Sequence, residues 1–260
     1  MKSARLYTEI VRYIHSLADS DEYLRRSVMR RADFSRRRKL GFTDYVYLTV
    51  QNLKTSLQAG LNAFIDAQKN GEIEYSKQAF SKGRQRIRPE AFQELYQAVV
   101  MKFYEKAEIH SWKGYQLFGI DGTRMNLPCT EELAQLYGAQ TSQGAPQVQT
   151  LVSCVYDLLN GIIVDTRFAH CKSSERDAAK DRITAFQLVQ AENPVFVMDR
   201  GYPSAELIDG IMNAGHKFIM RCPTEFLRGM KIPKMDNTLE HKFARLKHSS
   251  DENPTFKRKY

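Results

Sequence analysis

The sequence has few cysteines and no long apolar run, and each absence excludes a class of protein. No two of its four cysteines lie within three residues of each other. This excludes a CxxC redox pair and a zinc knuckle, and it favours free thiols in a reducing cytosol. The longest apolar runs, such as residues 196–198, are far shorter than the roughly 20 residues of a membrane helix. The first residues lead into a polar amphipathic stretch and not an apolar signal core, so secretion is not expected.

Basic charge is concentrated in the front of the chain. The 260 residues carry a net charge of +9 and are 42% hydrophobic, which is typical of a soluble globular protein. Residues 1–110 hold 20 Lys+Arg and 13 Asp+Glu, a balance of +7, whereas residues 111–260 hold 19 and 17, a balance of +2. A basic half joined to a near-neutral half predicts an arm for a polyanion attached to a second domain.

The front half, residues 1–110, is predicted to be an all-α region. Apolar residues recur at helical spacing within residues 10–17, 53–65 and 92–103. Pro89 stands where the first position of the last helix is expected. Strand-like alternation is hard to find before residue 115.

Two basic clusters interrupt these apolar stripes and are predicted to bind DNA. Arginine and lysine neutralise phosphates and release counterions, which gives sequence-independent affinity. Serine can add a phosphate contact. A solvated helix face is the alternative interpretation of each cluster. The candidate DNA-binding residues are Arg36, Arg37, Arg38 and Lys39 in the first cluster, and Ser81, Lys82, Arg84, Arg86 and Arg88 in the second.

The back half predicts a mixed α/β domain with a specific order of elements. Three strands come first, and Asn160-Gly161 forms the turn between the second and third. A helix, a strand, a helix and a strand follow, so the later strands add in parallel by right-handed crossovers. This order over residues 111–223 is that of a ribonuclease H-like catalytic domain whose last helix is missing. The predicted strands are 115–120, 147–158, 162–164, 195–198 and 217–221, with helices from Ser174 through about Val189 and from Pro203 to a cap at Gly215.

Two aspartates mark the candidate catalytic and metal-binding site. Asp121 is predicted to follow the first strand and Asp199 to end the fourth, and these strands lie side by side in the ribonuclease H-like arrangement. Two close carboxylates repel each other, and a divalent cation relieves that repulsion. Two Mg²⁺ ions roughly 4 Å apart are suited to phosphodiester chemistry. Arg200 and Tyr202 lie beside the second aspartate, where they are candidates to hold a phosphate or a displaced base.

With these motifs in place, the sequence resembles the bacterial insertion-sequence DDE transposases that carry a DGT and a DRGY motif. Residues 121–123 and 199–202 match the motifs of that family's first and second metal-binding aspartates, and residues 33–40 and 79–84 look like its DNA-binding segments. The resemblance implies Mg²⁺-dependent (or Mn²⁺-dependent) excision and insertion of DNA by hydrolysis and transesterification. It also implies double-stranded terminal repeats as the partner, a homodimer on paired ends, and a cytoplasmic, nucleoid-associated bacterial protein without membrane contact.

The chain departs from this family at the third acid. The family carries a glutamate in a Y-x2-R-x3-E motif on the helix after the fifth strand, and no such spacing occurs here. Residues 224–260 are polar and basic, and they are predicted to be the start of a β-rich insertion or a disordered tail. The expectation is therefore a truncated transposase with little or no strand-transfer activity alone.

Two other functions compete with this interpretation. A non-catalytic protein could occupy transposon ends and inhibit transposition. A phosphatase of the haloacid dehalogenase type also places an aspartate at a strand end before Gly-Thr. That family requires a nucleophilic aspartate two residues before the second one, where this chain has Gly119.

Overall fold

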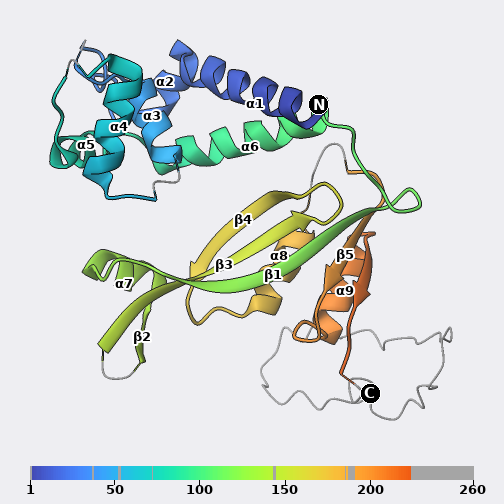
Figure 1. Ribbon diagram of the computed structural model, residues 1–260. Coiled ribbons are helices and arrows are strands. Elements are labelled where there is room, and N and C mark those ends of the chain that lie inside the picture. The colour runs from blue at the N-terminus through green and yellow to red at the C-terminus, as the bar shows by residue number, and fades with distance from the viewer. Residues whose placement is uncertain are drawn as a thin grey trace, which may run out of the picture. The chain divides into compact units, whose positions relative to one another are not determined.

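The chain folds into two compact units, Met1–Ile109 and His110–Tyr260 (Figure 1). All four cysteines are free thiols. In the part of the chain that the structure describes, no helix is long and apolar enough to cross a membrane. The computed structural model describes residues 2–36, 38–51, 54–71, 73–142, 145–184, 186 and 191–223.

The named elements of the first unit are all helices. Ser20, Ser56 and Ser76 start three of them, since each side chain accepts the backbone N–H three residues later. Pro89 is the first residue of the last helix, as its sequence position predicts. The helices are α1 (Lys2–Ala18), α2 (Asp21–Ser27), α3 (Phe42–Val50), α4 (Leu57–Lys69), α5 (Lys77–Arg84) and α6 (Pro89–Lys106).

Aromatic side chains hold the core of this unit together. Tyr23 is fully buried, and its hydroxyl donates a hydrogen bond of 2.8 Å to the carbonyl of Ala91 on α6. The Tyr45 ring of α3 stacks on Phe80 of α5 with 4.9 Å between centroids. The Tyr45 hydroxyl in turn lies 2.8 Å from that of Tyr75. These contacts tie α2 to α6 and α3 to α5.

Gly83 makes the close packing of Tyr45 on α5 possible. A Cβ atom at position 83 would lie 2.1 Å from the Tyr45 hydroxyl oxygen, far inside van der Waals contact. Glycine is unfavourable in a helix by roughly 1 kcal/mol relative to alanine, so its presence here reflects the ring that lies against it.

The second unit is built on a six-stranded mixed sheet. The strand order is β4-β3-β1-β5-β6, with β2 pairing beside the beginning of β3. β1, β3 and β4 are antiparallel neighbours, whereas β5 and β6 add in parallel to β1. This order is consistent with a ribonuclease H-like domain. The strands are β1 (Gln116–Asn126), β2 (Ala139–Ser142), β3 (Ala145–Asp157), β4 (Ile162–His170), β5 (Pro194–Met198) and β6 (Lys217–Met220).

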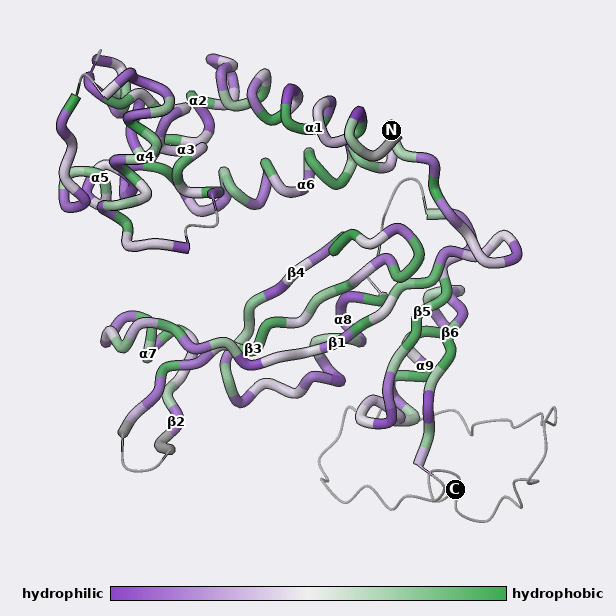
Figure 2. The backbone as a smooth tube through the Cα atoms, viewed as in Figure 1, coloured by the Kyte–Doolittle hydropathy of each residue, from purple (hydrophilic) through white to green (hydrophobic). Residues whose placement is uncertain are grey.

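Two helices pack together against one face of this sheet. α8 (Glu175–Thr184) contacts β1 and β3, and α9 (Ala205–Asn213) contacts α8 and β6. Phe118 and Phe196 are fully buried beneath them. Phe186 is tilted against the Phe118 ring, with 5.0 Å between centroids, and meets the Phe196 ring edge-on at 5.2 Å. Figure 2 shows the hydrophobic residues running along β5, as expected for a strand with neighbours on both sides.

Three features of this unit differ from the sequence prediction. α7 (Glu131–Tyr137) and β2 lie between the first two predicted strands and were not anticipated. β1 continues to Asn126, because its second half pairs with β3 even though it is polar and contains glycine. α8 ends at Thr184 and Phe186 is not helical. The other predicted helical positions after Thr184, residues 185 and 187–189, lie outside the described part.

The β3–β4 turn is fastened to the beginning of this unit. The buried Asp157 carboxylate accepts the backbone N–H groups of Leu159 and Asn160. The Asn160 side-chain amide then makes two hydrogen bonds to the backbone of His110, accepting its N–H at 2.7 Å and donating to its carbonyl at 3.1 Å. Gly161 completes the predicted turn with a φ of +72°.

We expect Gly83→Ala to lower the free energy of unfolding by about 1–3 kcal/mol, because the new methyl group forces the Tyr45 ring off Phe80. Chemical denaturation of the variant measures this loss. Gln78→Ala changes an exposed position of the same helix and should stay within about 0.5 kcal/mol of the parent. Equal stability of Gly83→Ala and the parent would contradict the packing described.

We expect the second unit to lose stability as the pH falls below 6.5. Burial against Phe196 lowers the pKa of His216 from its ordinary 6.5, and a hydrogen bond to the Ile183 backbone opposes this only in part. The folded state then binds fewer protons than the unfolded state, so stability is complete above 6.5 and declines below it. Denaturation midpoints at pH 7.5 and 5.5 test this: His216→Leu should flatten the dependence, and the exposed control His170→Gln should not.

Candidate functional site

The pairing of β1 with β5 brings the two predicted catalytic aspartates together. The last paired residues of these parallel strands are Gly119 and Val197, and Asp121 and Asp199 each stand two residues further along. Paired strands lie about 4.8 Å apart, so the two aspartates leave the ladder from neighbouring points. The prediction that these strands are adjacent is confirmed. The prediction that Asp121 follows its strand is wrong, since Asp121 lies within β1 opposite Cys154 of β3.

Each aspartate uses one carboxylate oxygen to fix its own backbone. Asp121 Oδ1 accepts the N–H of Gly122 at 2.9 Å, and Asp199 Oδ1 accepts the N–H of Gly201 at 2.7 Å. Both side chains are exposed. Within the described residues no hydrogen bond or ion pair occupies either Oδ2, so both carboxylates keep an oxygen that a ligand can reach.

Tyr202 lies between three acidic residues. Its side chain is only 3% exposed. Burial raises the pKa of its hydroxyl most, and Asp121, Glu175 and Asp199 raise it further, against a weaker opposing effect of the Gly122 amide. The hydroxyl therefore stays protonated at neutral pH. Tyr202 was predicted to lie beside the second aspartate, and it does so as a buried residue.

Sequence reasoning missed Glu175 as a member of this site. It identified the residue only as part of the start of a helix. Glu175 is the first residue of α8 and half-buried, and its Cγ would lie 3.0 Å from a Cβ placed on Gly122. The only sequence signal for Glu175 was its position at the start of the helix that follows the third predicted strand.

The next residue of α8 holds the turn that carries Asp199. Arg176 Nε donates a hydrogen bond of 2.7 Å to the carbonyl of Gly201. The N–H of Tyr202 also approaches the Asp199 carbonyl, at 3.3 Å. Arg200 is an exposed residue of the same turn. The 199–202 segment is therefore a turn fixed from both sides.

The chemistry of these oxygens fits a divalent cation. Mg²⁺ is a hard ion that proteins usually hold by one or two carboxylates while substrate phosphates complete its shell. Asp121 and Asp199 offer two such oxygens. Across the described residues no group of three or more His, Cys, Asp or Glu side chains is arranged to hold a metal. Residues 224–260, which follow the predicted fifth strand, lie outside the described part.

The structure brings four of the predicted DNA-binding residues to one cavity, which we call the basic pocket. It has a volume of about 280 Å³ and is lined by Arg36 and Arg38 from the α2–α3 connection and by Lys82 and Arg86 from α5 and its end. The other described candidates of the two clusters do not line it. Lys39 reaches toward the carbonyl of Glu74, Arg37 lies outside the described residues, and Ser81, Arg84 and Arg88 are the remainder.

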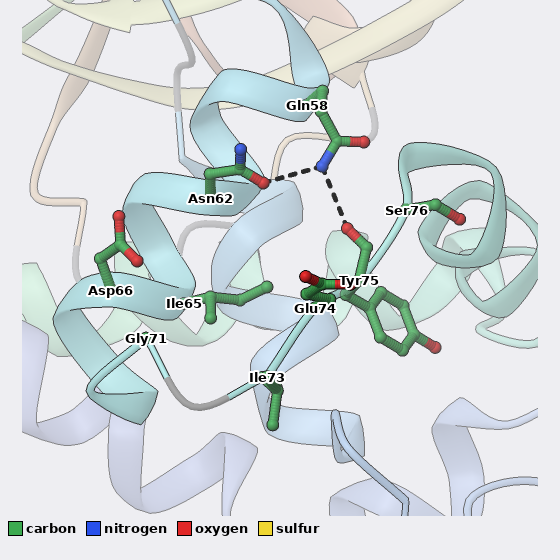
Figure 3. A pocket seen from close by; sticks show the side chains of 9 residues that line it. All are labelled: Gln58, Asn62, Ile65, Asp66, Gly71, Ile73, Glu74, Tyr75 and Ser76. Atoms are coloured by element: carbon green, nitrogen blue, oxygen red, sulfur yellow. Dashed lines mark hydrogen bonds between the residues drawn. The ribbon is translucent and has the colours of Figure 1, made fainter.

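A second cavity, of about 650 Å³, lies beside α4 and has a different character (Figure 3). Its charged lining residues are Asp66 and Glu74, and none of its described lining residues is basic. Gln58 Nε2 donates to Asn62 Oδ1 at 2.8 Å and to the carbonyl of Tyr75 at 3.0 Å. Figure 3 shows the Tyr75 ring turned away from these amides. The backbone carbonyl of Tyr75 is thus held by Gln58 at this second cavity, while Tyr75 also lines the basic pocket.

A mixed sheet with two aspartates on adjacent strands is consistent with a nuclease-type enzyme. Residues 112–258 match the family model of a transposase DDE domain. This match covers more than half of the chain, and the chain belongs to that family. The prediction of a DDE transposase is thereby confirmed at the level of the family. No curated protein matches the chain.

We expect Arg176→Ala to loosen the 199–202 turn without unfolding the protein. The lost hydrogen bond to the Gly201 carbonyl is worth about 1 kcal/mol, which corresponds to roughly fivefold faster amide exchange at Gly201 and Tyr202. Hydrogen–deuterium exchange measures the change. The exposed Lys172→Ala variant should leave these amides at the parent rate, and unchanged exchange in Arg176→Ala would remove Arg176 from this role.

Proposed function

We propose that this chain is an insertion-sequence transposase whose second unit cleaves and joins DNA phosphodiesters with the help of a divalent metal ion. The observation that carries the proposal is the register of β1 and β5, in which Asp121 and Asp199 each stand two residues beyond the last paired positions. Within the described residues, one oxygen of each carboxylate has no hydrogen-bond or ion-pair partner. Family membership supports the reaction class. A divalent ion held there supplies Lewis acidity toward a phosphate oxygen and lowers the pKa of bound water.

The residues around the two aspartates have distinct roles in this proposal. The amides of Gly122 and Gly201 hold one oxygen of each carboxylate, so the other is presented in a fixed direction. Arg200 is an exposed cation next to Asp199 and would pair with a backbone phosphate. Tyr202 keeps its proton at neutral pH and fills the space beneath the turn.

The first unit would hold the double-stranded DNA on which the second unit acts. Its net charge of +7 over residues 1–110 supports this assignment. A homodimer on paired transposon ends is the assembly that we propose for the reaction. Because the sequence contains no glutamate in the family's third motif, we expect weak metal binding and little strand transfer by this chain alone.

We expect Asp121→Asn and Asp199→Asn each to weaken Mn²⁺ or Mg²⁺ binding by at least about tenfold, since each removes a charged ligand. Isothermal titration calorimetry on the full chain measures this without any need for activity. Glu131→Gln on α7 removes an exposed acid outside the site and should bind metal like the parent.

The same variants separate catalysis from simple DNA binding. Both asparagine variants should bind duplex DNA like the parent and lose metal-dependent nicking of supercoiled plasmid. Metal affinity equal to that of the parent in both variants would contradict the proposed site. A parent that binds DNA but no divalent metal ion would favour the non-catalytic alternative.

A further inference from the structure

We propose that the basic pocket binds one backbone phosphate of double-stranded DNA, an inference that rests on the DNA-binding role proposed above. Arg38 and Lys82 are 44 positions apart in the chain, yet both line the same cavity of about 280 Å³. Each basic cluster taken alone is compatible with a solvated helix face, but in the structure the two clusters form two sides of one site.

Most of the cations that line the pocket have no acidic partner among the described residues. None of its described lining residues is acidic. Within the described part of the chain, Arg36, Arg38 and Lys82 have no ion-pair partner, and Arg86 has only Asp33 at 4.0 Å. Elsewhere in the same unit cations are closely paired, as Lys69 is with Asp44 at 3.1 Å. Like charges gathered in one cavity repel, and a bound anion relieves that repulsion.

The pocket is held open by packing that does not involve the cations. Tyr45 forms part of its lining, stacked on Phe80 and hydrogen-bonded to Tyr75. Burial raises the pKa of the Tyr45 hydroxyl, whereas Arg86 and Arg38 act to lower it, so both guanidinium groups lie near that hydroxyl. A preformed arrangement of this kind reduces the entropy cost of binding.

The size and chemistry of the pocket suit a phosphate group. Its volume is roughly nine times the 30 Å³ that one water occupies in the liquid, which leaves room for a phosphate and a few waters. Guanidinium groups match phosphate oxygens with paired hydrogen bonds. The exposed Arg84 and Arg88 extend the basic surface beyond the pocket, as a continuing DNA backbone requires and a free anion does not.

A pair of double variants of the full chain tests the pocket against general charge attraction. Arg38→Ala with Lys82→Ala removes one cation from each wall. Arg12→Ala with Arg25→Ala removes the same charge from exposed positions of α1 and α2, outside the pocket and outside both basic clusters. Affinity for a labelled 30-base-pair duplex is measured by fluorescence anisotropy over a salt series, and melting curves verify that both variants fold.

The pocket variant should bind DNA at least about 30-fold more weakly, since hydrogen bonds to charged groups contribute about 1.5–3 kcal/mol each. Its salt slope should fall by about 1, as expected for the loss of one phosphate contact. The control variant should lose less than about threefold. Arg38→Lys keeps the charge without the paired geometry and should give an intermediate affinity.

Three results would overturn the proposal. Equal losses in the two double variants would assign the binding to diffuse charge. The site would be one for free phosphate if two results came together. Millimolar inorganic phosphate would raise the melting temperature of the parent but not of the pocket variant, and the two proteins would bind DNA with equal affinity. Tighter binding of duplex RNA, lost in the pocket variant, would change the class of partner. A parent that shows no salt-dependent DNA binding would instead refute the proposed role of the first unit itself.

Discussion

The parallel pairing of β1 with β5 is the constraint on which the candidate active site depends. β1 has 11 residues and β5 has five, so the ladder between them ends at Gly119 and Val197 while β1 continues with β3 alone. The edge of β1 beyond Gly119 is therefore left open toward the turn that follows β5. Ligand sites of open α/β sheets lie outside the carboxyl ends of the strands, where the strand order reverses. Asp121 and Asp199 both lie there.

Hydrophobic periodicity predicted the strand order well, and contacts across the chain account for what it missed. The hairpin at Asn160-Gly161 and the strand ending at Met198 were visible because each has a local pattern. The second half of β1 was not, since Asp121, Gly122 and Asn126 are poor strand formers. The segment is extended because β3 pairs with it. Glu175 looked like an ordinary helix start because its closeness to Gly122 exists only in the folded chain.

The basic clusters are a second case in which contacts between distant parts of the chain could not be predicted from local sequence. Sequence reasoning weighted nine residues alike, because a run of cations has no internal feature that ranks its members. The fold separates Arg38 and Lys82, which share a cavity, from Arg84 and Arg88, which do not line it. Gly83 is part of the reason, since it lets the Tyr45 ring lie against α5. A glycine between two cations is thus a clue to packing that charge counting overlooks.

The pair of hydrogen bonds between the Asn160 side chain and the His110 backbone has a mechanical consequence. In the proposed reaction, DNA bound by the first unit and cleaved by the second would pull on the chain that joins the two units. The two hydrogen bonds from Asn160 to the His110 backbone would be loaded first, and the Asp157 carboxylate holds the Asn160 side chain in place. The load then passes into the β3–β4 hairpin, which is anchored by a long antiparallel ladder. Gln116 and the strand that carries Asp121 begin only beyond this anchor, so tension in the linker is carried away from the strand whose alignment the chemistry needs.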